Sequence, residues 1–167
     1  LGKVGDVGLE ILSIIKQNDL PLEFPAEVVE ASKKVPKTVL KNEVQGRRDL
    51  RHLPIVTIDG EDAKDLDDAV YVQQLSMDEF LLGVYIADVS YYVTENSFLD
   101  KDALMRGTSS YLADSVIPML PHKLSNGICS LNEGVERLTQ SCVMKIDKKG
   151  NVVDYDIFPS FIKSKKK

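Results

Sequence analysis

The strongest constraint on the fold is a pair of β-rich segments late in the chain, separated by a short polar turn. Residues 138–146 and 152–158 are both rich in apolar and β-branched side chains, and Lys148-Lys149-Gly150-Asn151 lies between them. Glycine and asparagine readily adopt the backbone conformations that tight turns require. The pattern therefore predicts a β-hairpin, and with it at least one antiparallel strand pair.

Other strand and helix patterns occur along the chain without regular alternation. Short β-branched or apolar runs predict strands at 55–58, 69–72, 81–87 and 109–112. Helical periodicity and capping residues predict helices at 7–18, 26–34 and 97–106, the last with Ser97 as its N-cap and Gly107 at its end. Residues 118–127 are expected to form a loop. This mixture predicts an α+β fold, preceded by a helical lead-in over residues 1–50.

The composition is that of a folded globular protein rather than a disordered or membrane-spanning one. Apolar residues make up 43% and charged residues 28% of the 167 positions. No apolar stretch approaches the roughly 20 residues of a membrane-spanning helix. Cys129 and Cys142 do not form a Cys-x-x-Cys pair, and we expect reduced thiols in a cytoplasmic protein. The net charge of −5 argues against a nucleic-acid binder, unless the charge is unevenly distributed.

The charge is indeed uneven, because Asp59–Asp68 carries six carboxylates and only one lysine. We call residues 59–68 the acidic segment. Expected strands flank it on both sides, Gly60 permits a sharp turn, and Leu66 is predicted to be its buried anchor. Two carboxylates about 5 Å apart repel each other by roughly 3 kcal/mol at an effective dielectric constant of 20. Such crowding requires protonation, separation into water, or a bound cation.

Two interpretations of the acidic segment remain open on the residues alone. Oxygen ligands favour Mg²⁺, Mn²⁺ or Ca²⁺ over zinc. An EF-hand is excluded because the glycine that it needs at its sixth position would be Lys64 or Val70. The alternatives are therefore a solvated acidic loop, or a carboxylate cluster that holds one or two Mg²⁺ ions for phosphate chemistry.

Five blocks in the chain resemble the RNB catalytic domain of the RNase II/RNase R family, in the family's order. They are Asp49–Ala69, Ile86–Val93, Arg106–Tyr111, Val116–Pro121 and Leu124–Asn132. The resemblance implies that residues 51–167 are the N-terminal part of an RNB domain, with a mixed, largely antiparallel sheet and flanking helices. Residues 1–50 are similar to the linker that follows the family's cold-shock modules.

The resemblance also implies a function. Members of the family are processive 3′→5′ hydrolytic exoribonucleases that bind the 3′ end of single-stranded RNA and release nucleoside 5′-monophosphates with Mg²⁺, for which Mn²⁺ can substitute. The family's four active-site aspartates match Asp59, Asp65, Asp67 and Asp68, hereafter the four aspartates. We assign Asp59, Asp65 and Asp68 as metal ligands and Asp67 as the catalytic residue. Tyr111 matches an aromatic residue that packs near the 3′-terminal nucleotides.

Family members continue beyond the matched region with further basic, RNA-gripping sequence. This accounts for the acidic balance, and we expect the 167 residues alone to be inactive or very weak. For Arg47, Arg48 and Arg51 the alternatives are contact with RNA phosphates and a solvated linker face, and we expect the latter. Lys163 and Lys165–Lys167 are expected to form an ordinary solvated basic tail. The alternative functions are a non-catalytic, RNA-binding or regulatory RNB-like protein and an unrelated structural Ca²⁺-binding domain.

Overall fold

The computed structural model describes residues 8–113 and 115–167, which form two units. The first unit combines the described residues up to Lys34 with Val93–His122, and the second combines Val35–Tyr92 with Lys123–Lys167. Residues 35–50, which we expected in the lead-in, thus belong to the second unit. A domain boundary at residue 50 stays a prediction. No helix within the described ranges is long and apolar enough to cross a membrane.

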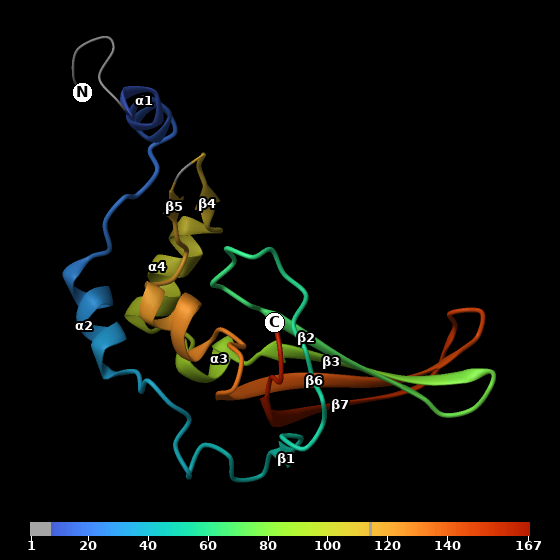
Figure 1. Cartoon of the computed structure of the whole chain (residues 1–167). Helices are drawn as coiled ribbons and strands as arrows, with labels where there is room; N and C mark the ends of the chain where they lie inside the picture. The colour runs from blue at the N-terminus through green and yellow to red at the C-terminus, as the bar shows by residue number, and fades with distance from the viewer. Residues whose placement is uncertain (1–7, 114) are drawn as a thin grey trace. The chain divides into compact units, whose positions relative to one another are not determined.

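The second unit is built on a five-stranded sheet of order β1-β7-β6-β3-β2 (Figure 1). Its strands are β1 (Arg48–Asp49), β2 (Asp68–Gln74), β3 (Glu79–Ala87), β6 (Glu136–Asp147) and β7 (Val152–Lys163). All neighbours are antiparallel except β1 and β7, which are parallel. Helix α3 (Val89–Tyr92) and the π-helical turn η1 (Leu124–Ile128) complete the unit. The predicted α+β fold with a largely antiparallel sheet is therefore confirmed.

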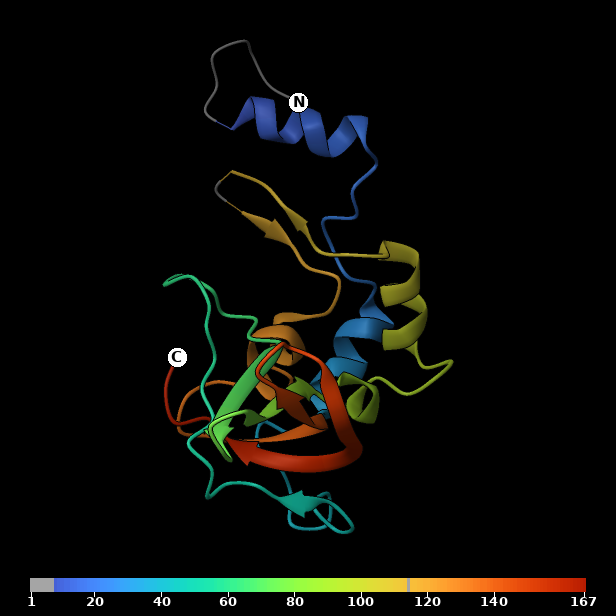
Figure 2. The same ribbon diagram turned by 90° about the vertical axis from the view of Figure 1, so that its right-hand side faces the viewer.

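The predicted hairpin is present as β6 and β7, and both strands are longer than expected. Asp147 closes the turn, because its Oδ1 accepts backbone N–H bonds from Lys149 and Asn151 at 2.9 and 2.8 Å. Gly150 has a φ of 85°, which an L side chain rarely adopts. The β2–β3 turn lies beside this one, where Lys148 Nζ and an Asp78 carboxylate oxygen are 2.8 Å apart. Figure 2 shows the curvature of the paired strands.

The predicted strand at 55–58 is wrong. Ile55 is fully buried in the core, but the segment forms only single-residue bridges, from Val56 to Val70 and to Lys166. Its backbone bonds are thus divided between β2 and the last residues of the chain, so no continuous ladder develops. Ile58 is 83% exposed and ends the ordered pairing. The β-branched run therefore indicates a segment with buried residues rather than a strand.

The core of the second unit lies beneath the acidic segment. Its buried members come from β2, β3, β7 and the intervening segments, and they are Ile55, Leu66, Ala69, Tyr85, Ala87, Leu131 and Ile162. The turn η1 corrects the expected loop at 118–127 in part. Leu124 and Ile128, four residues apart, are 0% and 2% exposed, and a helical turn places both side chains inward.

Gly83 in β3 is required by the aromatic ring of Tyr85, two residues away on the same strand face. A Cβ at position 83 would lie 2.6 Å from Tyr85 Cζ, and Tyr85 is 1% exposed and has no room to move. We expect Gly83→Ala to destabilise the second unit by about 1–3 kcal/mol through overpacking. Hydrogen exchange of the β3 and β6 amides would measure the loss.

The matched control for Gly83→Ala is Gly60→Ala. A Cβ at position 60 would meet no atom within 4 Å, and the backbone there is not left-handed. We expect this change to alter the free energy of unfolding by about 0.5 kcal/mol or less. Equal destabilisation by the two substitutions would show that the close contact with Tyr85 is not the cause.

The first unit contains three helices and a two-stranded ribbon among its described residues. They are α1 (Leu9–Gln17), α2 (Ala26–Lys34), α4 (Phe98–Arg106), β4 (Ser110–Tyr111) and β5 (Val116–Ile117). The predicted caps of α4 are confirmed, because Ser97 Oγ accepts from the Asp100 N–H and Gly107 ends the helix. The Arg106 guanidinium is buried, bonded to Asp102 at 2.7 Å and stacked 3.9 Å from the Phe24 ring.

Candidate active site

The acidic segment leads directly into β2 and is anchored by one apolar side chain. Leu66 is 2% exposed and packs in the core, as predicted. Three of the four aspartates are exposed and the other, Asp65, is partly buried. Burying a leucine side chain contributes roughly 1.5–3 kcal/mol. The anchor therefore restrains Asp65 and Asp67, its two neighbours in sequence, at the surface of the sheet.

Backbone hydrogen bonds tie the end of the acidic segment to two other parts of the second unit. The Leu131 N–H donates to the Leu66 carbonyl oxygen at 2.8 Å. The Ala87 N–H, at the end of β3, donates to the Asp67 carbonyl oxygen at 2.9 Å. The chain at Leu66 and Asp67 is thus held from both sides, which favours a defined placement of the neighbouring carboxylates.

The terminal lysine is also part of this arrangement, and the expectation of ordinary solvated sequence is wrong for it. Lys167 Nζ donates to the carbonyl oxygens of Glu61 and Ala63 at 2.7 and 2.8 Å. The backbone at residues 165–166 bonds to residues 55 and 57, which brings Lys167 beside the acidic segment. No sequence signal distinguishes this lysine from its neighbours, since the contact spans more than 100 residues.

The four aspartates lie close enough to influence one another electrostatically. Although Asp67 is exposed, surrounding protein atoms partly desolvate its carboxyl and raise its pKa, and the negative charges of Asp65, Asp68 and Asp59 raise the pKa further. Repulsion between carboxylates disfavours the ionised form, which is the cause of the second effect. Glu61 and Asp62, which belong to the same segment, are exposed and do not contribute to this shift. The fold thus brings Asp59, Asp65 and Asp68 near enough to act on Asp67.

The donor set fits a hard divalent cation in chemistry and in charge. All four side chains offer carboxylate oxygens, and the repulsion that Asp67 experiences from the other three is what a bound cation would relieve. In the part of the chain that the structure describes, however, no three acidic, histidine or cysteine side chains are arranged to hold a metal ion. The four aspartates therefore provide the ligand chemistry without a closed coordination shell.

Tyr111 lies in the first unit, on β4, where it pairs with Val116 of β5. Its side chain is 69% exposed, so Tyr111 is not a core tyrosine. Exposed aromatic rings are suited to stacking on nucleobases. A role in RNA binding stays a prediction.

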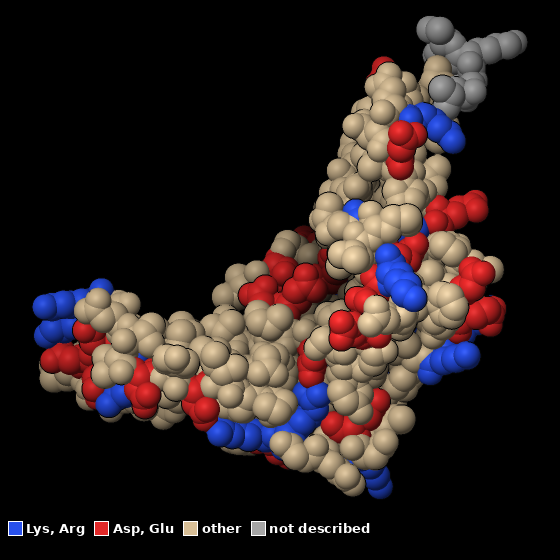
Figure 3. All heavy atoms as spheres, turned by 180° about the vertical axis from the view of Figure 1, so that it is seen from behind, with Lys and Arg blue, Asp and Glu red and all other residues tan. Residues whose placement is uncertain are grey.

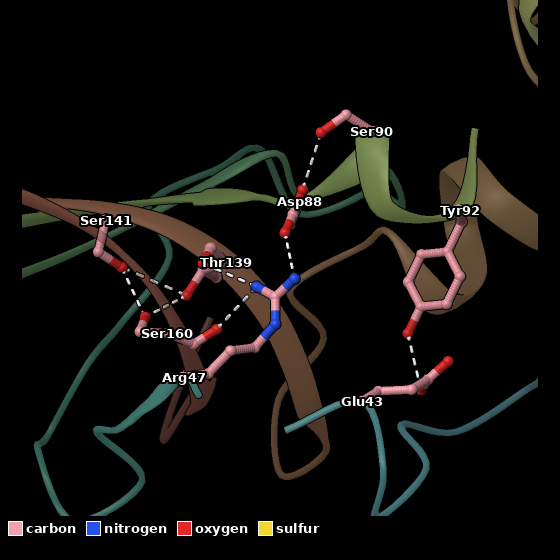
Figure 4. A network of polar contacts seen from close by, with 8 residues as sticks. All are labelled: Glu43, Arg47, Asp88, Ser90, Tyr92, Thr139, Ser141 and Ser160. Atoms are coloured by element: carbon pink, nitrogen blue, oxygen red, sulfur yellow. Dashed lines mark hydrogen bonds and ion pairs between the residues drawn. The ribbon is translucent and has the colours of Figure 1, made fainter. Parts of the chain in front are cut away.

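Arg47 is not on a solvated face, which corrects the expectation for this residue (Figure 4). Its Nη2 lies 2.6 Å from Asp88 Oδ2, and the two side chains are only 9% and 12% exposed. Asp88 directly follows β3, and its other carboxylate oxygen accepts from Ser90 Oγ at 3.0 Å. A second contact holds the segment that precedes β1, because Tyr92 Oη donates to the Glu43 carboxylate at 3.3 Å. This network fastens residues 43–47 to the sheet.

Several basic side chains of the second unit pair with carboxylates. On the face in Figure 3, lysine and arginine side chains lie in small groups among acidic ones. Besides Arg47–Asp88, the intra-unit pairs are Arg48–Asp156, Arg51–Asp49, Arg51–Glu136, Lys145–Glu79 and Lys148–Asp78. Exposed pairs of this kind contribute little stability, about 0–1 kcal/mol each.

Comparison with known proteins identifies relatives over the whole chain. Ribonuclease R of Thermotoga maritima is 56% identical over 169 residues, which cover 100% of this chain and 24% of that protein. Ribonuclease R 1 of Lactococcus lactis is 53% identical and covers 98% of this chain and 20% of that protein. The chain thus spans about a quarter or less of the length of these relatives.

Solved structures with the same fold include complexes with RNA. RNase R of Mycoplasma genitalium bound to double-stranded RNA superimposes with a TM-score of 0.92 at 36% identity, over 99% of this chain and 29% of that one. Yeast Ssd1, described as a pseudonuclease, shares the fold with a TM-score of 0.81 at 20% identity over 100% of this chain and 22% of its own. The fold alone therefore does not decide whether a relative is a nuclease.

The family model of the RNB domain matches residues 47–167. The match includes all of the acidic segment, the strands that flank its end, and the Ser130–Leu131 stretch against which it packs. It begins at Arg47, the residue that ties the preceding segment to the sheet. The chain belongs to the RNB domain family.

Proposed function

We propose that the full-length protein containing this chain is a 3′→5′ hydrolytic exoribonuclease that degrades single-stranded RNA processively to nucleoside 5′-monophosphates. The observation that carries the proposal is the presence of the four aspartates in a chain of the RNB domain family, with Asp59, Asp65 and Asp68 near enough to act on Asp67. The names and RNA complexes of the relatives support a ribonuclease. Because this chain is a minor part of their length, activity belongs to the whole protein.

The four aspartates have distinct roles in this proposal. Asp59, Asp65 and Asp68 would hold one or two Mg²⁺ ions, or Mn²⁺ in their place. A bound divalent cation stabilises the charge that develops on a phosphodiester during hydrolysis and generates a nucleophile from water. Asp67, whose carboxyl is surrounded by the charges of the other three, is the residue on which cleavage depends most directly. The bonds from Leu131 and Ala87 hold the backbone that carries it.

Tyr111 would contact the RNA rather than the reacting phosphate. Stacking of a base on an aromatic ring contributes about 1–3 kcal/mol and tolerates every base, as a non-specific exonuclease requires. Its 69% exposure leaves the ring accessible for this contact. RNase R of Mycoplasma genitalium has been solved with ribose-methylated single-stranded RNA, which supports RNA as the ligand class.

A non-catalytic, RNA-binding protein is the second candidate, and the shared fold of the pseudonuclease Ssd1 favours keeping it. The presence of all four aspartates argues against it, because a site without selection for chemistry has no reason to keep carboxylates that repel one another. The two candidates differ in one observable, the release of mononucleotides.

The test uses the full-length protein and a 5′-labelled single-stranded RNA. Stepwise shortening from the 3′ end, dependent on Mg²⁺ or Mn²⁺ and stopped by EDTA, is the expected result. Binding without shortening would establish the non-catalytic alternative, and internal cuts would contradict an exonuclease. The isolated 167 residues serve as a second sample, from which we expect little or no product.

A further inference from the structure

One buried serine bonds to the backbone on both sides of Asp65. Ser130 is 0% exposed, and its Oγ accepts the Leu66 N–H at 3.0 Å. The same hydroxyl donates to the Lys64 carbonyl oxygen at 2.7 Å. A serine hydroxyl has one proton to donate and lone pairs to accept, so both functions are used here. The peptide groups before and after Asp65 are thereby fixed by a single side chain.

The residue after Ser130 adds a further hydrogen bond to the same stretch of backbone. The Leu131 N–H donates to the Leu66 carbonyl oxygen at 2.8 Å, so Ser130 and Leu131 together make three hydrogen bonds to the stretch from Lys64 to Leu66. The apolar anchor Leu66 alone would prevent the segment from leaving the core. It would not prevent a shift along the chain direction, which the three directional bonds do.

A buried arginine holds the serine in place. Arg137, near the start of β6, is 6% exposed, and its Nε donates to the Ser130 carbonyl oxygen at 2.7 Å. Its Nη1 donates to the Glu136 carbonyl oxygen at 2.8 Å. Among the described residues no carboxylate lies within ion-pair distance of this guanidinium, and burial lowers the pKa of Arg137. Burying a cation without a counter-ion costs solvation free energy.

We propose that Ser130 is a positioning residue for the carboxylates of the acidic segment, and that Arg137 fixes Ser130 for this purpose. The proposal rests on the proposed function, since the carboxylates must be placed for metal-assisted hydrolysis. Displacing a reacting group by about 1 Å can reduce a rate by 10²-fold. Groups that orient metal ligands from behind typically change metal affinity or activity by about 10–100-fold when they are removed.

The test compares Ser130→Ala with Ser160→Ala in the full-length protein. Ser160 is the matched control because it is also 0% exposed, and among the described residues its hydroxyl bonds only to the hydroxyls of Thr139 and Ser141, at 2.6 Å each. For Ser130→Ala we expect kcat to fall by about 10–100-fold and the Mg²⁺ concentration for half-maximal activity to rise. KM for RNA should stay within about threefold, since the serine does not touch RNA.

A second measurement does not depend on activity. Hydrogen exchange in metal-free buffer should accelerate at least about tenfold at residues 64–68 in Ser130→Ala, because the Leu66 amide loses its acceptor. Amides of β6 and β7 should keep their protection, which also checks folding. If Ser130→Ala does not fold, Arg137→Met is used instead. It removes the donor to Ser130 while keeping a similar length, and we expect the same changes at smaller size.

The outcomes separate the two proposals. If the wild-type protein releases no mononucleotides, the proposed function fails, while the exchange measurement still decides whether Ser130 restrains the acidic segment. If the wild type is active but Ser130→Ala equals Ser160→Ala in kcat, in Mg²⁺ dependence and in exchange at residues 64–68, the positioning role is overturned and the proposed function stands.

Discussion

Replacing Asp67 by asparagine in the full-length protein is expected to reduce the release of mononucleotides by roughly 10³-fold, the scale of losing a positioned polar group in an active site. Asparagine keeps the size of the side chain and removes only its charge. RNA binding should persist, because the RNA contact proposed for Tyr111 is unaffected. Product release from a 5′-labelled single-stranded RNA measures the first effect, and retention of the same RNA on a filter measures the second.

Asp67→Asn should also raise thermal stability when no divalent cation is present. The pKa of Asp67 is raised in the folded chain, so its ionised form at neutral pH disfavours folding, and asparagine removes that cost. Exposure of the residue to water keeps the gain to about 1 kcal/mol or less. Asp62→Asn is the matched control: it neutralises an exposed carboxylate of the same segment that does not act on Asp67.

Measuring mononucleotide release together with thermal stability distinguishes a loss of catalysis from a loss of folding. An Asp67→Asn protein that is inactive and less stable than the wild type would show that Asp67 supports the fold rather than the reaction. Normal activity in Asp67→Asn, or equal loss in Asp62→Asn, would contradict the assignment of Asp67 within the four aspartates.

Replacing Arg47 by methionine is expected to destabilise the second unit by about 3–5 kcal/mol. The change removes the partner of Asp88, which is only 12% exposed at its side chain, and leaves a buried, uncompensated carboxylate. Arg47 Nη1 also lies 3.4 Å from the Thr139 carbonyl oxygen and 3.5 Å from that of Ser160, so contacts to β6 and β7 weaken together. Native-state hydrogen exchange of amides in these strands measures the loss.

The adjacent arginine provides the control for Arg47. Arg48 pairs with Asp156, and both side chains are 56% exposed, so Arg48→Met should cost about 1 kcal/mol or less. Combining Arg47→Met with Asp88→Asn should recover part of the stability, because no unpaired charge remains buried. A double variant less stable than Arg47→Met alone would contradict the buried-charge explanation.

Local patterns predicted those parts of the fold that depend on residues near one another in sequence. The β6–β7 hairpin follows from two apolar runs and a turn that Asp147 and Gly150 close within a few residues. Helix α4 follows from Ser97 and Gly107, whose capping bonds span three or four residues. Segment 55–58 fails by the same logic, because its short β-branched run has the local preference of a strand but shares its hydrogen bonds between two distant partners.

In the candidate site, too, some features depend on nearby residues and others on residues far apart in the sequence. The number, type and spacing of the carboxylates in the acidic segment are properties of the sequence, and so is the placement of Leu66 among them. The positions of Ser130, Arg137 and Lys167 around that segment are not. Ser130 reaches Lys64 across 66 residues, and Lys167 reaches Glu61 across 106. Sequence analysis placed Ser130 only in a block of family resemblance and assigned it no role.

The residue types and the local turns and caps could be predicted from the sequence, because they depend on side-chain chemistry and short-range hydrogen bonds. Which groups come into contact follows from tertiary packing. Packing buries Arg47 against Asp88, brings Asp59, Asp65 and Asp68 near enough to act on Asp67, and places Ser130 against the backbone on both sides of Asp65. Burial and register arise from the packing of the whole sheet, where distant segments compete for the same partners, and no local pattern encodes the result of that competition.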